Sequence, residues 1–383
     1  MNIIRSRFIA LVATALGAVS SASIADVTVG ITLSATGPAA ALGGPQKNTA
    51  ALLPTELAGQ KIKWIVLDDA TDPTNATRNA KKLTGEDHAD ILIGGTTTAN
   101  SLAVLNVAAE TSTPQISMAP FQAPADKFLW AFQTPQSNTL MAGAVVDHMK
   151  ANGVKTVGYI GFSDPFGESW FNAFKPLIEA AKIELVASER FNRTDTSVTA
   201  QILKIASTNA DAVMIGASGT PGMLPHITLA DRGYKGKVYH THGVANKAVL
   251  QLGGAKLDGA FVPMGPGMVA ELLGDSHPSK KPALEYIAAY EKAHGADSRT
   301  TFGAHLWDAM LLIRAALPEA LKGGQPGTPQ FRKAMRDALE KTKDVAATQG
   351  VFTYTTSDHV GLDKRAYVLT RVEKMNWKLM AGN

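Results

Sequence analysis

Short apolar runs alternate with amphipathic stretches along the first part of the chain. Residues 27–33, 62–67 and 91–93 are apolar runs that predict buried strands, and the stretches that begin near Gly44 and at Thr74 predict helices between them. Asp72-Pro73 supplies a helix cap followed by proline at the first helical position. Strand, helix and strand repeating at this spacing predict a parallel sheet with helices on both faces.

The same alternation starts again near residue 138 and predicts a second α/β unit. Residues 282–321 are mainly helical in pattern, Gly323 to Gly327 form a flexible break, and short strands return after Val345, including 366–371. A length of 383 residues fits two domains of roughly 150 residues each. The strands expected in the second unit are 156–161, 184–188, 212–215, 238–240 and 259–262, and its helices are 138–150, 168–181, 198–206 and 223–231.

The first 25 residues have the pattern of a secretory signal peptide. Arg5 and Arg7 precede an apolar segment from Phe8 to Val19, and small residues lead to Ala25. We expect cleavage near Ala25 and export to the periplasm. The apolar segment is too short to span a membrane, and no later stretch is long enough.

Composition narrows the classes of function. The chain has no cysteine, which excludes disulfides, thiolate metal sites, a cysteine nucleophile and a lipid-modified N-terminal cysteine. Without Arg5 and Arg7, the 37 basic residues become 35 against 33 acidic ones, a mature charge near +2. This balance, with no basic run carrying interleaved aromatics, argues against a nucleic-acid partner.

The segment Ile91 to Ser101 is the first candidate wall of a binding site. Its apolar strand ends at two glycines, and Thr96, Thr97 and Thr98 follow where a helix can begin. Unpaired N–H groups and a partial positive charge at a helix start make a seat for a small anion. A threonine that merely caps the helix is the alternative.

Other polar residues at predicted strand ends carry weaker signals. His240 and His242 lie two apart, so both rings would point to one side of an extended strand, but only distant His226 could add a third metal ligand. No metal site is therefore expected. Asp164 before Pro165 favours a turn or helix start over a general base. The chain also lacks the common nucleophile-elbow, phosphate-loop, dinucleotide and zinc-helix motifs, which favours binding over catalysis.

Six segments together resemble the leucine/isoleucine/valine-binding branch of the type I periplasmic solute-binding proteins, which serve ABC importers. They occur in the family's order from Val27 onward: Leu33-Ser34-Ala35-Thr36-Gly37-Pro38 with Gly43, Asp68-Asp69-Ala70-Thr71-Asp72-Pro73, Ile93-Gly94, Ile116-Ser117, Phe166-Gly167-Glu168 and Gly243-Val244-Ala245-Asn246. The resemblance implies the type I fold, two doubly wound α/β lobes joined by three crossovers. Lobe one would span 26–136 and 266–365, and lobe two 137–265 and 366–383.

The resemblance also implies a ligand site in the cleft between the lobes. The positions that hold the ligand carboxylate in the amino-acid binders correspond to Thr98, with Thr97 beside it, and to backbone groups of Ala119 and Phe121. The remaining positions of the implied site are Phe166 as an aromatic cover from lobe two, Leu42 from the first loop, and Ser218 or Gly219 where relatives often place an aromatic residue.

One departure from the family bears on specificity. The amino-acid binders place a glutamate before the Gly-Val motif to pair with the ligand ammonium, and this chain has His242 there. A buried ammonium without a carboxylate partner costs several kcal/mol. Phe121 also replaces a hydroxyl residue near the carboxylate. With Phe166 and Met264, these changes predict an aromatic or hydrophobic organic acid without an α-amino group.

The expected function is that of a monomeric periplasmic protein that captures such a carboxylate for an ABC importer permease. We expect it to perform no reaction and to need no cofactor. Three alternatives stay open: a branched-chain amino acid as ligand, with Asp68, Asp164 or another acid serving the ammonium; a secreted hydrolase using Asp164 and His242; and a sensory ligand-binding subunit.

Overall fold

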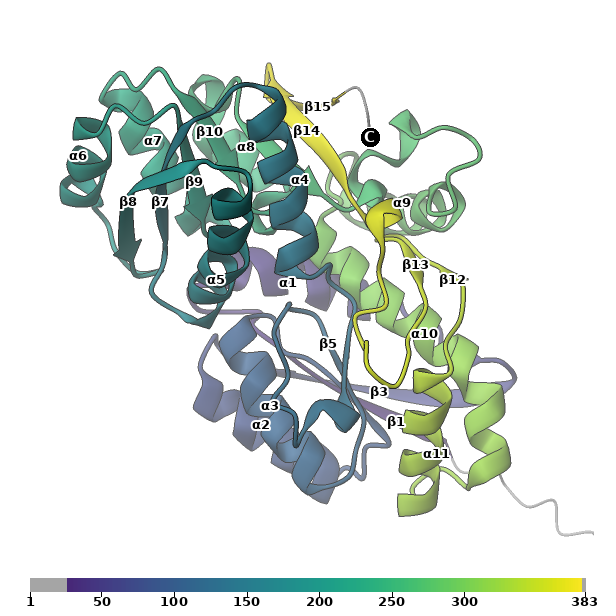
Figure 1. Ribbon diagram of the computed structural model, residues 1–383. Helices are drawn as coiled ribbons and strands as arrows, with labels where there is room; N and C mark the ends of the chain where they lie inside the picture. Colours follow the sequence, from purple (N-terminus) through teal and green to yellow (C-terminus); the bar gives the residue numbers. More distant parts are fainter. Residues whose placement is uncertain (1–25, 381–383) are drawn as a thin grey trace, which may run out of the picture.

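The computed structural model describes residues 26–380, so the predicted signal peptide lies outside the described residues. Its strands form two large sheets and one small pair (Figure 1). The first sheet has the order β2-β3-β1-β4-β5-β6 and the second the order β15-β14-β11-β10-β9-β7-β8. We call the elements packed around the first sheet the first lobe and those around the second sheet the second lobe.

The first lobe is built on parallel pairing of β3, β1, β4, β5 and β6. Its strands are β1 (Val27–Leu33), β2 (Glu56–Leu57), β3 (Gln60–Asp68), β4 (Ile91–Ile93), β5 (Gln115–Ser117) and β6 (Ala131–Gln133). Its helices are α1 (Ala40–Ala50), α2 (Pro73–Gly85), α3 (Thr98–Glu110), α9 (Lys280–His294), α10 (Thr301–Gly323) and α11 (Pro329–Glu340), and the small pair is β12 (Val345–Ala346) with β13 (Val351–Phe352).

Helices cover both faces of the first sheet, as the alternation predicts. Leu92 packs on α2 and α3, whereas its neighbours Ile91 and Ile93 pack on the side chains of α10 and α11. Successive side chains of a strand point to opposite faces, so three apolar residues in a row serve two cores. An apolar run without polar alternation is the pattern of a strand buried on both sides.

The second lobe repeats this arrangement with two added antiparallel strands. Strands β8, β7, β9, β10 and β11 are parallel, and β14 and β15 join antiparallel at the β11 edge. The strands are β7 (Thr156–Phe162), β8 (Glu184–Phe191), β9 (Ala212–Gly216), β10 (Lys237–His240), β11 (Phe261–Met264), β14 (Val368–Glu373) and β15 (Asn376–Leu379). The helices are α4 (Asn138–Ala151), α5 (Pro165–Ala180), α6 (Thr199–Ser207), α7 (Met223–Asp231) and α8 (Lys247–Gly253).

Several element boundaries differ from those that the sequence predicts. Helix α1 begins at Ala40 rather than near Gly44, α5 begins at Pro165 rather than Glu168, and β8 runs on to Phe191 rather than ending at Ser188. Helix α11 was not predicted, although Thr328 and Pro329 form a standard helix start and the Thr328 side chain caps it.

Three connections between the lobes meet at one place. The Gln136 side chain, between β6 and α4, donates to the carbonyls of Gln349 (3.1 Å) and Ala366 (2.7 Å) on the segment that leads back to β14. Gly265, just after β11, packs so closely there that an added Cβ would lie 1.7 Å from Gln349 Oε1. Only glycine fits so close to Gln349. The segment after β11, which returns from the second lobe to the first, therefore packs against the other two connections.

Candidate functional site

A narrow cavity of about 30 Å³ lies between the two lobes, at the carboxyl ends of their parallel strands. In open α/β sheets this is where ligands bind. The cavity is small for a ligand pocket, so a ring-sized ligand requires the lobes to part. Its lining residues from the first lobe are Leu42, Thr96, Thr97, Thr98, Met118, Ala119, Pro120, Phe302 and His305; the others are Pro135, Phe166, Arg193, Ser218, His242 and Gly243.

The threonine cluster after β4 forms one wall, and its hydroxyls already have partners. Thr97 is the N-cap of α3 and accepts from the Asn100 N–H (3.2 Å), which is the capping role that the sequence left as the alternative. Thr98 donates to the Pro120 carbonyl (2.9 Å). These contacts fix the first turn of α3 against the cavity, so its helix dipole places partial positive charge there.

The predicted backbone donors of the neighbouring loop are also engaged. The Ala119 N–H donates to Ser117 Oγ (3.1 Å), and the Phe121 N–H donates to Gln133 Oε1 (2.9 Å). The Phe121 ring does not line the cavity but packs in the core between the sheet, α2 and α3. In this conformation a ligand carboxylate can bind these two N–H groups only by displacing those acceptors.

Arg193 enters the cavity from the second lobe and was missed by the sequence analysis. Its side chain is only 11% exposed, its guanidinium lies 4.1 Å from the centre of the Phe162 ring, and its Nη1 donates to Ser218 Oγ (3.0 Å). The sequence pattern predicts a strand that ends at Ser188, whereas β8 continues to Phe191. Arg193 therefore follows the carboxyl end of a parallel strand, which is where ligands bind in open α/β sheets.

Asp164 is a structural carboxylate that holds both a helix and this arginine. Its Oδ1 accepts from the N–H groups of Phe166 (3.0 Å) and Gly167 (3.1 Å), and its Oδ2 accepts from Arg193 Nε (2.5 Å). The helix-start interpretation is therefore confirmed. All of these contacts occupy the carboxylate, which gives no support to the hydrolase hypothesis that pairs Asp164 with His242.

His242 lies in the cavity, but His240 does not point the same way, which corrects the prediction that both rings share one side. Strand β10 ends at His240, and His242 begins a 3₁₀ turn, so strand alternation no longer applies. His240 Nε2 lies 2.8 Å from His226 Nδ1 within the second lobe, whereas His242 packs near Phe166 and Trp170.

His305 faces the cavity from the first lobe and is a second residue that the sequence analysis missed. It lies in the first turns of α10, whose N-cap is Thr300, and its ring nitrogen Nε2 lies 3.5 Å from Thr301 Oγ1. Thr300 is a capping residue within the region assigned broadly as helical. A helix predicted to begin after Thr300 would have placed His305 in its first turns. The capping threonine was therefore the sequence feature that could have identified His305.

Burial makes the cavity histidines neutral. Desolvation lowers the pKa of His242 to about 4, and desolvation with a small contribution from His242 lowers that of His305 to about 3. In each ring the Nδ1 atom is buried without a hydrogen-bond partner. Arg193 is therefore the one charged residue in the cavity lining, and the lining residues include no carboxylate.

A family model described as "Periplasmic binding protein" matches residues 26–375. The chain belongs to the periplasmic binding protein family. The Leu/Ile/Val-binding protein homolog 3 of Brucella melitensis biotype 1 is 26% identical to it over 348 residues, which cover 88% of this chain and 89% of that protein. The predicted membership in the leucine/isoleucine/valine-binding family and the predicted type I fold are confirmed.

Solved structures of ligand-binding proteins are similar to this periplasmic binding protein over 93% of its chain. An extracellular ligand-binding receptor from Rhodopseudomonas palustris HaA2 is 43% identical and superimposes with a TM-score of 0.92, covering 93% of this chain and all of that one. A solute-binding protein of an ABC transporter from R. palustris in complex with benzoate is 22% identical, with a TM-score of 0.78, over 93% of this chain and 96% of that one.

The periplasmic binding protein brings together seven of its ten predicted site residues, namely Leu42, Thr97, Thr98, Ala119, Phe166, Ser218 and His242. Besides Phe121, two others lie outside the lining. Met264 is buried in the core of the second lobe. Gly219 lies beside the cavity, and an added Cβ there would come within 2.5 Å of Leu42 Cδ1, a contact between the lobes. The apolar walls come instead from Met118, Phe302 and Leu42.

Within residues 26–380, no group of three or more histidine and acidic side chains is placed to hold a metal ion. Over the same residues, no helix has both the length and the apolar character needed to cross a membrane.

Proposed function

We propose that this periplasmic binding protein captures a small carboxylate without an α-amino group, an aromatic or hydrophobic organic acid, and delivers it to the membrane permease of an ABC importer. The observation that carries the proposal is the charge of the cavity. One guanidinium, that of Arg193, meets two neutral histidines, and its one carboxylate partner, Asp164, lies outside the lining.

A carboxylate ligand would complete the hydrogen bonding of Arg193. Its Nε and Nη1 atoms have partners, Asp164 and Ser218, whereas no hydrogen bond from its Nη2 occurs among the described residues. Charge-assisted hydrogen bonds from arginine to a carboxylate are among the strongest in proteins. On the opposite wall, the first turn of α3 at Thr98 would attract the same anion through its dipole.

The same cavity disfavours an α-ammonium group. Asp68, one acid that could have served an amine, accepts hydrogen bonds from Thr36 and Ala70 and lies outside the lining, and Asp164 is occupied by Arg193 and the start of α5. His242, the residue at the family's glutamate position, is neutral. An unpaired buried ammonium costs several kcal/mol, enough to exclude an amino acid at micromolar concentration.

The apolar lining suits a hydrocarbon body. Phe166, Phe302, Met118 and Leu42 surround the polar groups, and aromatic rings pack well edge to face or offset. The benzoate complex from R. palustris supports an aromatic acid only as an example of what this fold accommodates. We place lobe one at 26–136 and 266–365 and lobe two at 137–265 and 366–383. The division of the strands between the two large sheets supports these bounds. Closure of the lobes on the ligand would be the signal to the permease.

Ligand screening by thermal shift and calorimetry tests the proposal. Leucine and 4-methylpentanoate differ only in the α-amino group, so they form a matched pair, and benzoate adds a ring. We expect binding of benzoate or 4-methylpentanoate and none of leucine. The Arg193→Gln substitution should weaken that binding about 10- to 100-fold, the value of one or two charge-assisted hydrogen bonds.

Arg190→Gln is the matched control. Arg190 lies near the end of the same strand but pairs with Glu168 and stacks on Phe171, outside the cavity. It should leave ligand affinity unchanged. A strong shift with leucine and none with either acid would contradict the proposal.

A branched-chain amino acid is the second candidate ligand, because the B. melitensis relative is named a Leu/Ile/Val-binding protein homologue. The His242→Glu substitution separates the two. If His242 is what rejects an ammonium, the variant should gain leucine binding that the wild type lacks. Leucine binding by the wild type, with no improvement in the variant, would favour the second candidate.

A further inference from the structure

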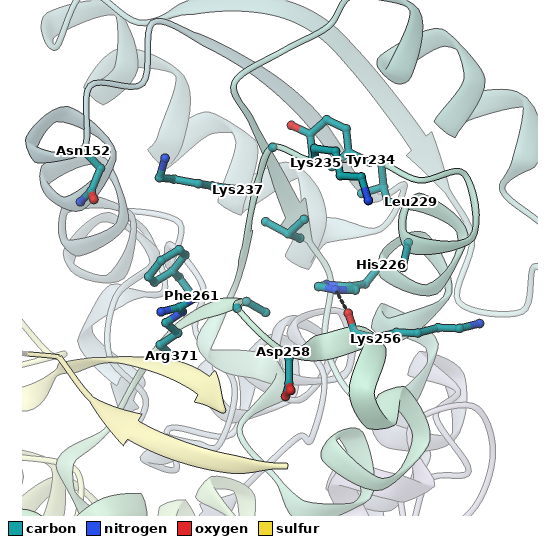
Figure 2. Close-up of a pocket in the computed structure, with 15 residues that line it drawn as sticks. Asn152, His226, Leu229, Tyr234, Lys235, Lys237, Lys256, Asp258, Phe261 and Arg371 are labelled. Carbon is teal, nitrogen blue, oxygen red and sulfur yellow. Dashed lines mark hydrogen bonds between the residues drawn. The ribbon is translucent and has the colours of Figure 1, made fainter. Parts of the chain in front are cut away.

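A second cavity, of about 500 Å³, lies in the second lobe at the opposite ends of the strands that reach the cleft. Lys237 begins β10 and Phe261 begins β11, so this cavity opens at the amino ends of these strands. Figure 2 shows Lys237 and Asn152 on one side of it, with Phe261 and Arg371 below them on the same side, and Lys235, His226 and Lys256 on the other side. The lining residues of this cavity and of the cleft cavity do not overlap.

Four basic side chains line this cavity, and two of them have no counter-ion. Lys256 pairs with Asp231 (2.6 Å), and Arg371 lies 3.5 Å from Glu373. Neither Lys235 nor Lys237 has an ion pair among the described residues, and both border the cavity. Uncompensated ammonium groups around a concave surface concentrate positive potential there.

The nearby carboxylates are already used by the backbone. Asp258, the one acid in the lining, accepts from the Lys374 N–H (2.9 Å). Asp211, close to Lys237, accepts from the N–H groups of Lys155 (2.8 Å) and Thr156 (2.9 Å). These bonds hold both carboxylates to the chain and leave Lys235 and Lys237 without a direct partner.

Two neutral polar side chains of the lining, those of Tyr234 and His226, form hydrogen bonds within the lobe. Tyr234 donates from its hydroxyl to the Ala210 carbonyl (2.8 Å). His226 is 2.9 Å from the Lys256 carbonyl through Nε2, drawn in Figure 2, and bonded to His240 through Nδ1. The polar side chains of Tyr234 and His226 are therefore used within the lobe, whereas the ammonium groups of Lys235 and Lys237 are not. Phe261, with the Arg371 guanidinium 6.0 Å from its ring centre, adds an apolar surface.

We propose that this cavity is a second ligand site, which binds a small polyanion carrying two or more oxyanion groups. Lys237 and Arg371 on one side of the cavity would hold one group, and Lys235 or Lys256 on the other side a second (Figure 2). Citrate represents the polycarboxylates and pyrophosphate the phosphate compounds that share this chemistry. A monocarboxylate ligand of the cleft would leave this site empty, because one charge cannot engage both sides.

Calorimetric titration of the full protein with citrate and with pyrophosphate, at low and at moderate salt, tests the site. We expect at least one of the two to bind, with affinity that falls as salt rises. The comparison between the two probes identifies the oxyanion that the site prefers. The double substitution Lys235→Gln with Lys237→Gln should weaken that binding at least tenfold.

The control is Lys61→Gln with Lys63→Gln, two exposed lysines at the same spacing on β3 of the first lobe. It removes the same charge and should leave the affinity unchanged. Three results would overturn the proposal: no binding of either probe, an equal loss in the control variant, or a loss in Arg193→Gln but not in the Lys235/Lys237 variant. The last would place the polyanion in the cleft.

Discussion

Arg193 and Asp164 form an ion pair of 2.5 Å at the wall of the cleft, with side chains only 11% and 28% exposed. The same carboxylate accepts two N–H groups at the start of α5. Asp164 therefore fixes the arginine and also neutralises part of its charge. An anion in the cleft would share this guanidinium with Asp164.

The Asp164→Asn substitution tests this sharing. Asparagine caps a helix about as well as aspartate, so α5 should keep its start, whereas Arg193 loses its counter-ion. The ligand-free protein should lose about 1–3 kcal/mol of unfolding free energy, because a buried charge is left unpaired. The stabilisation produced by a bound carboxylate should increase, since the ligand then supplies the missing charge.

Asp72→Asn provides the comparison for this experiment. Asp72 caps α2 through the N–H groups of Thr74 and Asn75, far from any arginine in the cleft. Chemical unfolding should show little change in the unfolding free energy of the ligand-free protein, and thermal shift should show little change in the stabilisation by a bound carboxylate. Weaker carboxylate binding in Asp164→Asn would instead show that Asp164 matters more for holding Arg193 in position than for neutralising its charge.

The buried histidines should make stability depend on pH. In the unfolded chain a histidine takes up a proton below about pH 6.5. Folded His242 and His305 resist protonation down to about pH 4 and about pH 3, because burial lowers their pKa. The unfolded state then binds more protons in this window, so unfolding free energy falls as pH drops from 6.5 toward 4. His226 and His240, whose pKa values burial also lowers, add to the same trend.

The His305→Gln variant isolates one of these contributions. Urea unfolding at pH 7, 6, 5 and 4 should show a shallower loss of stability than in the wild type. The difference should be on the order of 3 kcal/mol by pH 4, from the pKa shift of this single histidine. Parallel curves for the two proteins would show that His305 is not buried and neutral in the folded state.

Gly219 and Leu42 meet across the cleft, so an added methyl group should oppose closure. Gly219→Ala places a Cβ 2.5 Å from Leu42 Cδ1, at a backbone φ of +64°. Because ψ is −166°, the backbone lies in a region that glycine almost alone adopts, and we expect about 1–3 kcal/mol of lost stability. Ligand affinity should fall about tenfold as well, because the lobes no longer close fully.

Gly153→Ala separates these two effects. Gly153 also has a left-handed φ, +71°, but an added Cβ there meets open space. It should also lose stability, about 1 kcal/mol, and keep its ligand affinity. Adding Leu42→Ala to Gly219→Ala should restore the affinity of the Leu42→Ala single variant, and a failure to do so would place the cause within the second lobe.

The sequence determined the fold class because its signals are local. Apolar runs such as Ile91–Ile93 and caps such as Asp72-Pro73 act within a few residues and predicted most of the α/β elements, and the ordered motifs, through their resemblance to the family, implied the type I fold. Errors fell at boundaries, such as the end of β8, where propensity alone does not show how far a neighbouring strand continues the hydrogen bonding.

The candidate site could be predicted in part by the same logic. Strand-end positions located Thr97, Thr98, Phe166, Ser218 and His242, which all line the cavity. Phe121 and Met264 do not line this cavity, because the sequence does not show which way an apolar side chain near a strand end turns. His240 was misplaced because a turn follows it and ends the strand alternation.

Only the tertiary structure decided the chemistry of the cleft. Arg193, His242 and His305 are 49 or more residues apart along the chain, and folding of two lobes brings them to one small cavity. Their charge states follow from burial, and burial is a property of everything packed around them rather than of neighbouring residues in the sequence. The sequence specified two lobes and a cleft, and packing across the cleft placed one arginine and two neutral histidines inside it.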